Sequence, residues 1–147
     1  MVDSEIVLGV DVGVRRIGLA WGDTEVKLAS PLDPIENDGQ ALDRLAKLIA
    51  NMNATTVVVG LPRNNDGVET KQSDYSRQFA DDLGDTLSNQ SIDNVNIVMQ
   101  DESLTSVEAE AILKSDKRHY NDKMLRDGTL DSQAAVIILT DYLEAIR

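Results

Sequence analysis

The sequence of 147 residues predicts a single α/β domain, residues 1–147, with a five-stranded mixed sheet and helices on both faces. Two observations predict this class. The first part of the chain carries short apolar runs separated by turns, which indicates a meander of three antiparallel strands. The rest alternates apolar runs with segments of helical period, which indicates two further strands parallel to the first, joined by right-handed crossovers.

The meander begins with an apolar run at residues 5–12, which predicts a central strand covered on both faces. Gly13 begins a turn, and residues 17–21 follow closely enough to form a hairpin with the first strand. A third strand is expected at residues 26–29, and Pro31 should stop it because proline cannot donate a backbone hydrogen bond.

The later elements follow from apolar periodicity: recurrence every three or four residues predicts helices, and short β-branched runs predict strands. Asn37 or Asp38 can cap the first helix. Residues 105–108, Thr-Ser-Val-Glu, fit a capping box that begins another. The expected elements are a helix at about 42–52, a strand at 55–61, a helix at about 70–88, a strand at 95–99, a helix from 105, a polar loop at 114–128 and a helix at about 129–146.

Composition excludes several classes of site. The chain has no cysteine and one histidine, His119, which argues against disulfides, thiolate zinc sites and sites built on several imidazoles. The sequence contains no apolar run of about 18 residues, so no membrane span is expected. The N-terminus lacks the pattern of a signal peptide, so a cytoplasmic protein is expected.

The formal net charge of -12 argues against a nucleic-acid binder, which usually carries a basic face. The distribution of charge argues the other way, because Arg15 and Arg16 closely follow Asp11 and five further basic residues cluster in one segment. Charge alone leaves open a phosphate-binding surface or a solvated loop in an acidic protein. The five clustered residues are Lys114, Lys117, Arg118, Lys123 and Arg126.

Asp11 is the most informative residue, because it lies inside the apolar run of the central strand. Burying an unpaired carboxylate costs several kcal/mol, and a bound metal is one way to compensate it. Asp101 and Glu102 lie at the end of the fifth strand, and Asp131 lies in the first turn of the last helix. Successive strand side chains alternate faces, so only one of Asp101 and Glu102 can face Asp11; Glu102 is favoured.

Carboxylates without histidine or cysteine form a hard-oxygen site that suits Mg²⁺ or Mn²⁺. Two such ions about 4 Å apart can activate water and stabilise the leaving oxygen of a phosphodiester. Each acid also has a structural interpretation. Asp11 can cap a turn or pair with Arg15 or Arg16, the acids at 101–102 can be strand-end residues, and Asp131 can complement the helix dipole. The residues expected to hold phosphates are Arg15, Arg16, Arg63, Lys114, Lys117, Arg118, Lys123 and Arg126.

Four segments together resemble the YqgF (RuvX) family of the RNase H-like superfamily, in order and over nearly the whole chain. They are Leu-Gly-Val-Asp-Val-Gly at 8–13 with Arg-Arg-Ile-Gly at 15–18, Val-Val-Gly-Leu-Pro at 58–62 with Asn-Asp-Gly at 65–67, Asp-Glu-Ser-Leu-Thr-Ser at 101–106, and Asp-Ser-Gln-Ala-Ala at 131–135 with Ile-Leu at 138–139 and Tyr-Leu at 142–143.

This resemblance implies an RNase H-like fold and a metal-dependent endonuclease for structured nucleic acid, acting in maturation of the 5′ end of pre-16S rRNA or on four-way DNA junctions. It implies catalytic and metal-binding roles for Asp11, Glu102 (or Asp101) and Asp131. Ser103 stands where the family usually has arginine. If that arginine contacts phosphate, this chain binds more weakly or uses residues 114–126 instead.

Two other functions remain open from the sequence. The Asp-Val-Gly turn at 11–13 is also compatible with an actin-like ATP-binding module, although such proteins pair two domains and this chain has room for one. A non-catalytic scaffold that binds RNA is the other. The expected partners are structured RNA or branched DNA and a ribosomal precursor particle, with the chain a monomer or weak homodimer.

Overall fold

The computed structural model of the chain describes residues 4–63, 66–102 and 129–146. Five strands form one sheet in the order β3-β2-β1-β4-β5. The first three strands pair antiparallel, and β4 and β5 run parallel to β1, so the predicted mixed sheet is confirmed. The elements are β1 (Ile6–Val12), β2 (Arg16–Asp23), β3 (Ala29–Glu36), α1 (Ala41–Met52), β4 (Ala54–Pro62), α2 (Lys71–Asn89), β5 (Asn96–Glu102) and α5 (Thr129–Ala145). The helix expected from 105 and the loop expected at 114–128 lie outside the described residues.

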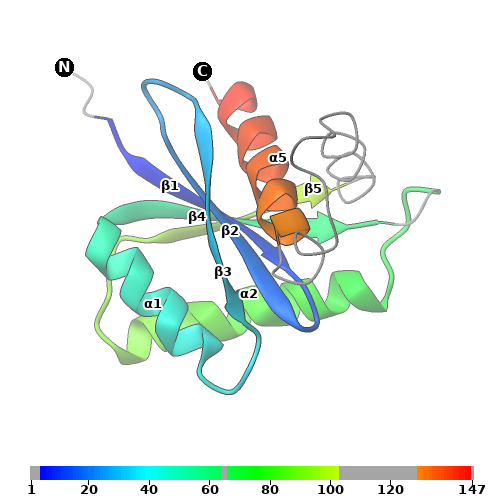
Figure 1. Ribbon diagram of the computed structural model, residues 1–147. Helices are drawn as coiled ribbons and strands as arrows, with labels where there is room; N and C mark the ends of the chain where they lie inside the picture. The colour runs from blue at the N-terminus through cyan, green and yellow to red at the C-terminus, as the bar shows by residue number, and fades with distance from the viewer. Residues whose placement is uncertain (1–3, 64–65, 103–128, 147) are drawn as a thin grey trace.

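Helices cover both faces of the sheet, as the apolar run of β1 predicted. In Figure 1, α1 and α2 lie on one side and α5 crosses the other. Successive residues of β1 therefore meet different helices. Leu8 and Val10 belong to the core beneath α1 and α2, and Val7 belongs to the core beneath α5.

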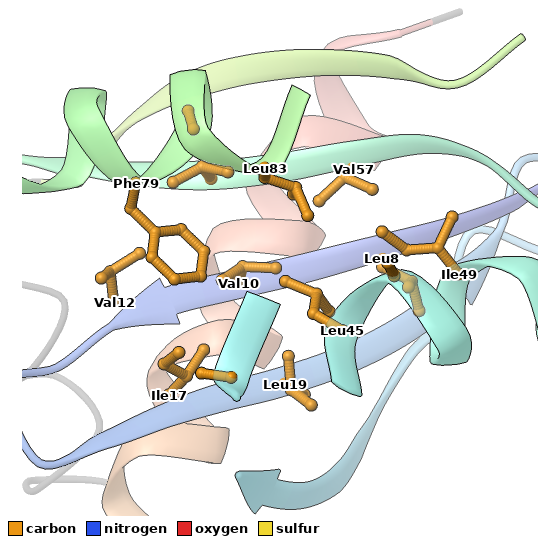
Figure 2. Packing of buried hydrophobic residues seen from close by; sticks show 14 of the residues in the cluster. Leu8, Val10, Val12, Ile17, Leu19, Leu45, Ile49, Val57, Phe79 and Leu83 are labelled. Carbon is orange, nitrogen blue, oxygen red and sulfur yellow. The ribbon is translucent and has the colours of Figure 1, made fainter. Parts of the chain in front are cut away.

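The larger core lies between the sheet and the first two helices. Figure 2 shows Leu45 and Ile49 of α1 and Phe79 and Leu83 of α2 directed onto the central strands. Leu45 and Leu83 are fully buried. The helical spacing of these side chains is what turns one face of each helix toward the sheet.

On the other face, α5 packs directly against the backbone of β1 and β2. A Cβ atom added to Gly9 would lie 2.8 Å from Cβ of Leu139 and 2.9 Å from the carbonyl oxygen of Ala135, and one added to Gly22 would lie 2.9 Å from Cδ1 of Leu143. Glycine at both positions is therefore what allows this close approach. Although α5 is strongly apolar, no helix in the described part of the chain is long and apolar enough to span a membrane.

The prediction for the third strand was wrong. The strand β3 runs over Ala29–Glu36 and includes Pro31 and Pro34. It is an edge strand, where the missing N–H of proline need not break a hydrogen-bond ladder. Its register with β2 also shifts by one residue between the pairs made by Ile17 and Leu19, so Pro34 lies in a β-bulge.

The cap of α1 also differs from the prediction. Its N-cap is Gln40, and no side-chain hydrogen bond caps the helix. The carboxylate of Asp38 instead accepts a hydrogen bond from the backbone N–H of Gln40 (2.9 Å) and pairs with Arg44 (3.0 Å). The side chain of Asn37 turns away from the helix, toward the turn between β1 and β2.

Candidate active site

Asp11 lies near the carboxyl end of the central strand, on the face covered by α5. Val7 contacts α5 and Gly9 lies directly beneath it, and strand residues two apart share a face. The side chain is half-buried, so the expectation of full burial was wrong. The strand ends one residue later, at Val12, which leaves Asp11 at the rim of the covered surface.

The strands on either side of Asp11 present glycine to it. Asp11 pairs with Gly18 of β2. On the other side the pairing of β1 with β4 ends at Val10 with Val59, and Gly60 follows Val59. Glycine therefore stands at the paired position on β2 and next to the last paired position on β4.

The helix α5 runs antiparallel to β1, as its contacts with the glycines of the sheet show. Leu143 packs on Gly22, the partner of Val7, and the next turns of the helix, at Leu139 and Ala135, pack on Gly9. The N-terminal turn of α5, which contains position 131, therefore lies toward the carboxyl end of β1, where Asp11 stands.

The register of β5 distinguishes the two adjacent acids. Asp101 pairs with Leu61 and Glu102 pairs with Pro62 of β4. Val59 faces the α1–α2 core, so alternation assigns positions 61 and 101 to that side and position 102 to the α5 side. The carboxylate of Asp101 is exposed and bonds to Arg63, with 3.0 Å between Nε and Oδ1.

The basic residues expected near the site have different surroundings. Arg16 lies two residues before Gly18, the partner of Asp11, so it begins β2 on the α5 side; its Nε is 3.9 Å from Oε1 of Glu36. Arg15 is exposed in the turn before it. The residues Lys114, Lys117, Arg118, Lys123 and Arg126 lie outside the described residues.

Arg63 belongs to an ion-pair network beyond the end of β4. Besides Asp101 it contacts Glu69 (3.8 Å), which also accepts two hydrogen bonds from Arg77 (2.8 and 3.0 Å). These bonds from Arg77, with the charges of Arg77 and Arg63, hold the pKa of Glu69 below its ordinary value. Arg63 therefore holds the segment after β4 in place and is itself partly neutralised.

Within the described side chains, no group of three acidic or histidine residues stands close enough to hold a metal ion. The side chains of Glu102 and Asp131 lie outside that description, whereas their backbone positions belong to β5 and α5. A site formed at positions 11, 102 and 131 would offer carboxylate oxygens alone. That donor set fits Mg²⁺ or Mn²⁺ and does not fit the nitrogen and sulfur preferences of zinc or copper.

Sequence reasoning missed the residues that secure the turn after Asp11. The side chain of Asn37 donates to the carbonyl oxygen of Gly13 (2.7 Å), and that of Gln72 donates to the carbonyl oxygen of Val12 (3.0 Å). A turn-region asparagine is a common local signal that does not reveal a distant partner. The glycines beneath α5 had a clearer signal, because glycine inside a strand often marks the close approach of another backbone.

Comparison with known proteins gives a family and a fold. The model of a family described as "RuvX: Holliday junction resolvase" matches residues 5–145. A protein of Chloroflexus aggregans named "Putative pre-16S rRNA nuclease" is 36% identical over 99% of this chain and 98% of its own length. A protein of the same name from Sulfurihydrogenibium sp. is 33% identical over 95% of this chain and 90% of its own.

Solved structures share the architecture at low sequence identity. The fowlpox virus Holliday junction resolvase has a TM-score of 0.59 at 13% identity, covering 97% of this chain and 99% of its own. Thermus thermophilus RuvC bound to a Holliday junction has a TM-score of 0.53 at 14% identity, covering 96% and 94%. At these identities the likeness concerns the fold, which is that of RNase H-like resolvases.

Proposed function

Because the chain belongs to the RuvX family of Holliday junction resolvases, we propose that it is a nuclease that hydrolyses phosphodiester bonds in the precursor of 16S rRNA. The family resemblance seen in the sequence is confirmed, as is the RNase H-like fold. Relatives that align over nearly their full length carry the name of a pre-16S rRNA nuclease, which supports RNA as substrate. The family description and the resolvase folds support four-way DNA as the second candidate substrate.

The proposed catalytic residues are Asp11, Glu102 and Asp131. The observation that carries this assignment is the packing of α5 on Gly9 and Gly22, because it directs the N-terminal turn of the helix toward the end of β1 that carries Asp11. Strand alternation supports Glu102 over Asp101, whose carboxylate is engaged with Arg63.

Divalent ions held by these three carboxylates would supply activation of a water and charge stabilisation at the leaving oxygen. The residues of the chain then have distinct tasks. Asp11 presents its carboxylate near the end of the central strand, paired with Gly18 of β2. Arg16, on the same side of the sheet, lies where its charge can offset that of a phosphate.

The test is a cleavage assay with Mn²⁺ on a pre-16S rRNA fragment and on a four-way DNA junction. We expect Asp11→Asn to abolish cleavage and to weaken Mn²⁺ binding measured by calorimetry, because an amide cannot replace the charge of the carboxylate. Asp82→Asn is the matched control: Asp82 is also half-buried but lies on α2, across the sheet. Circular dichroism should show both variants folded.

Undiminished cleavage by Asp11→Asn would rule out the proposed site. If the wild type binds the rRNA precursor but cleaves it in neither Mn²⁺ nor Mg²⁺, the non-catalytic scaffold is the correct function. Faster cleavage of the rRNA fragment would favour RNA processing, and faster cleavage of the four-way DNA would favour junction resolution. We further propose that the protein acts on a ribosomal precursor particle in the cytoplasm as a monomer or weak homodimer, which sedimentation on gradients of cell extract can test.

A further inference from the structure

The turn between β1 and β2 begins two residues after Asp11 and carries an exposed apolar side chain. Val14 is 72% exposed at its tip, and the exposed Arg15 follows directly. Val12 and Ile17, the last pair of the hairpin, are both buried in the α1–α2 core. The tip therefore projects from a fixed base beside the proposed active site.

Three backbone carbonyls of this turn accept hydrogen bonds from residues outside the β1–β2 hairpin. Those of Val12 and Gly13 accept hydrogen bonds from the side chains of Gln72 and Asn37, and that of Arg15 accepts one from the backbone N–H of Asn37 (2.9 Å). The side-chain amide of Asn37 also donates to the hydroxyl of Tyr75 (2.6 Å). These contacts come from α2 and from the segment before α1, so the turn is anchored to both.

Its place beside Asp11 distinguishes Val14 from Val26, whose own turn is also held by hydrogen bonds, to the carboxylate and carbonyl oxygens of Asp23. Val26 is 62% exposed in the turn between β2 and β3, which lies at the opposite end of the hairpin from α2 (Figure 1). A lone exposed valine needs no explanation. An exposed valine that is followed by an arginine, rigidly held, and adjacent to a catalytic carboxylate has the composition of a nucleic-acid contact: an apolar surface for a base or sugar and a charge for phosphate.

We propose that the tip of the β1–β2 turn contacts the nucleic acid next to the cleaved bond, with Val14 packing on a base or sugar and Arg15 binding a phosphate. Gln72 and Asn37 are positioning residues that fix the tip through its carbonyls. This inference rests on the proposed nuclease function. It adds a contact between the tip of the turn and the nucleic-acid strand beside the site. Residues on the opposite face of the sheet hold that tip in place.

Binding of a fluorescent four-way junction and a pre-16S rRNA fragment, measured in EDTA at several salt concentrations, tests the tip. We expect Val14→Ser to raise Kd by about 3–10-fold with little change in salt dependence, as loss of a partly buried apolar contact predicts. Arg15→Gln should lower the slope of log K against log salt by about 1, as loss of one phosphate contact predicts. Val26→Ser is the matched control and should bind as the wild type does.

The positioning role is tested by non-additivity. Gln72→Met keeps the size of the side chain but removes the donor, and we expect it to raise Kd by about 3–10-fold, the effect of one hydrogen bond. In a Val14→Ser/Arg15→Gln background the same change should have no further effect on Kd, because it acts through the tip. A purely structural role for Gln72 would leave its effect unchanged in that background.

If Val14→Ser and Arg15→Gln bind with the same Kd as a wild-type protein that binds and cleaves normally, this inference is overturned and the nuclease assignment remains intact. A wild-type protein that neither binds nor cleaves either nucleic acid would overturn both.

Discussion

Replacing Gly9 with alanine should damage the nuclease more than it damages the fold. The added methyl group would lie 2.8 Å from Cβ of Leu139 and 2.9 Å from the carbonyl oxygen of Ala135. Ordinary carbon contacts are about 3.5–4.0 Å, so α5 must move away from β1 by about 1 Å. Both of these atoms belong to the helix itself, so no flexible side-chain end can absorb the clash.

The two consequences have different magnitudes. Overpacking of this kind costs about 1–3 kcal/mol, which lowers Tm by roughly 4–12 °C in a chain of this size and leaves the protein folded at 25 °C. A displacement of 1 Å between catalytic groups costs about 100-fold in rate. Since the proposed ligand Asp131 begins the same helix, we expect Mn²⁺-dependent cleavage to fall by about 10–100-fold at 25 °C.

The assay compares cleavage at 25 °C with thermal unfolding for Gly9→Ala and for Gly84→Ala. Gly84 is the matched control, because its added Cβ would lie 3.7 Å from Cδ1 of Ile97, an ordinary contact. Alanine there should stabilise α2 by up to about 1 kcal/mol and leave cleavage unchanged. A Gly9→Ala protein with lowered Tm but wild-type cleavage would refute the role of α5 in positioning the site, and an unchanged Tm would refute the tight contact itself.

Three further predictions concern stability and charge. Ser132 donates a hydrogen bond to the carbonyl oxygen of Leu32 (2.8 Å) and is buried, so Ser132→Ala should lower the free energy of unfolding by about 1 kcal/mol in urea titrations. Arg77→Met should raise the pKa of Glu69 toward its ordinary value, followed by NMR, because Arg77 is the main cause of the depression. Because the pKa of Glu69 is lower in the folded protein than in the unfolded chain, its ionised carboxylate stabilises the folded state above the unfolded pKa. This stabilisation is lost as pH falls through the folded pKa, so the wild type and Arg77→Met should have the same stability in acid. Asn53 ends α1 with φ 56° and ψ 40°, so Asn53→Ala should cost about 1 kcal/mol and Asn53→Gly little, as measured by thermal unfolding.

Periodicity predicted the sheet and the helices α1 and α2, because each has one dominant hydrophobic pattern. It failed at β3, where proline misled the assignment: an edge position and a β-bulge remove the constraint that Pro31 was expected to impose. Neither the edge position nor the bulge can be read from a local window. Both are properties of the assembled sheet.

For the candidate site, the sequence suggested residues but not their surroundings. It placed Asp11 on the central strand and favoured Glu102 by alternation, which the register of β5 supports. It could not reveal that Asp101 pairs with Arg63 across two strand ends, because that contact spans 38 residues. The anchoring of the turn by Gln72 was invisible for the same reason, being a contact over 60 residues.

The two faces of the sheet become complete at different times during synthesis. The described residues of the α1–α2 core all precede residue 100, whereas the opposite face waits for α5, which begins at Thr129. Domains fold as their segments emerge from the ribosome, so the nascent chain can complete one core while Val7, Ala20 and Val58 still lack their cover. On the proposed assignment the last carboxylate arrives with that helix. A nascent chain from which α5 has not yet emerged then cannot cut RNA at this site.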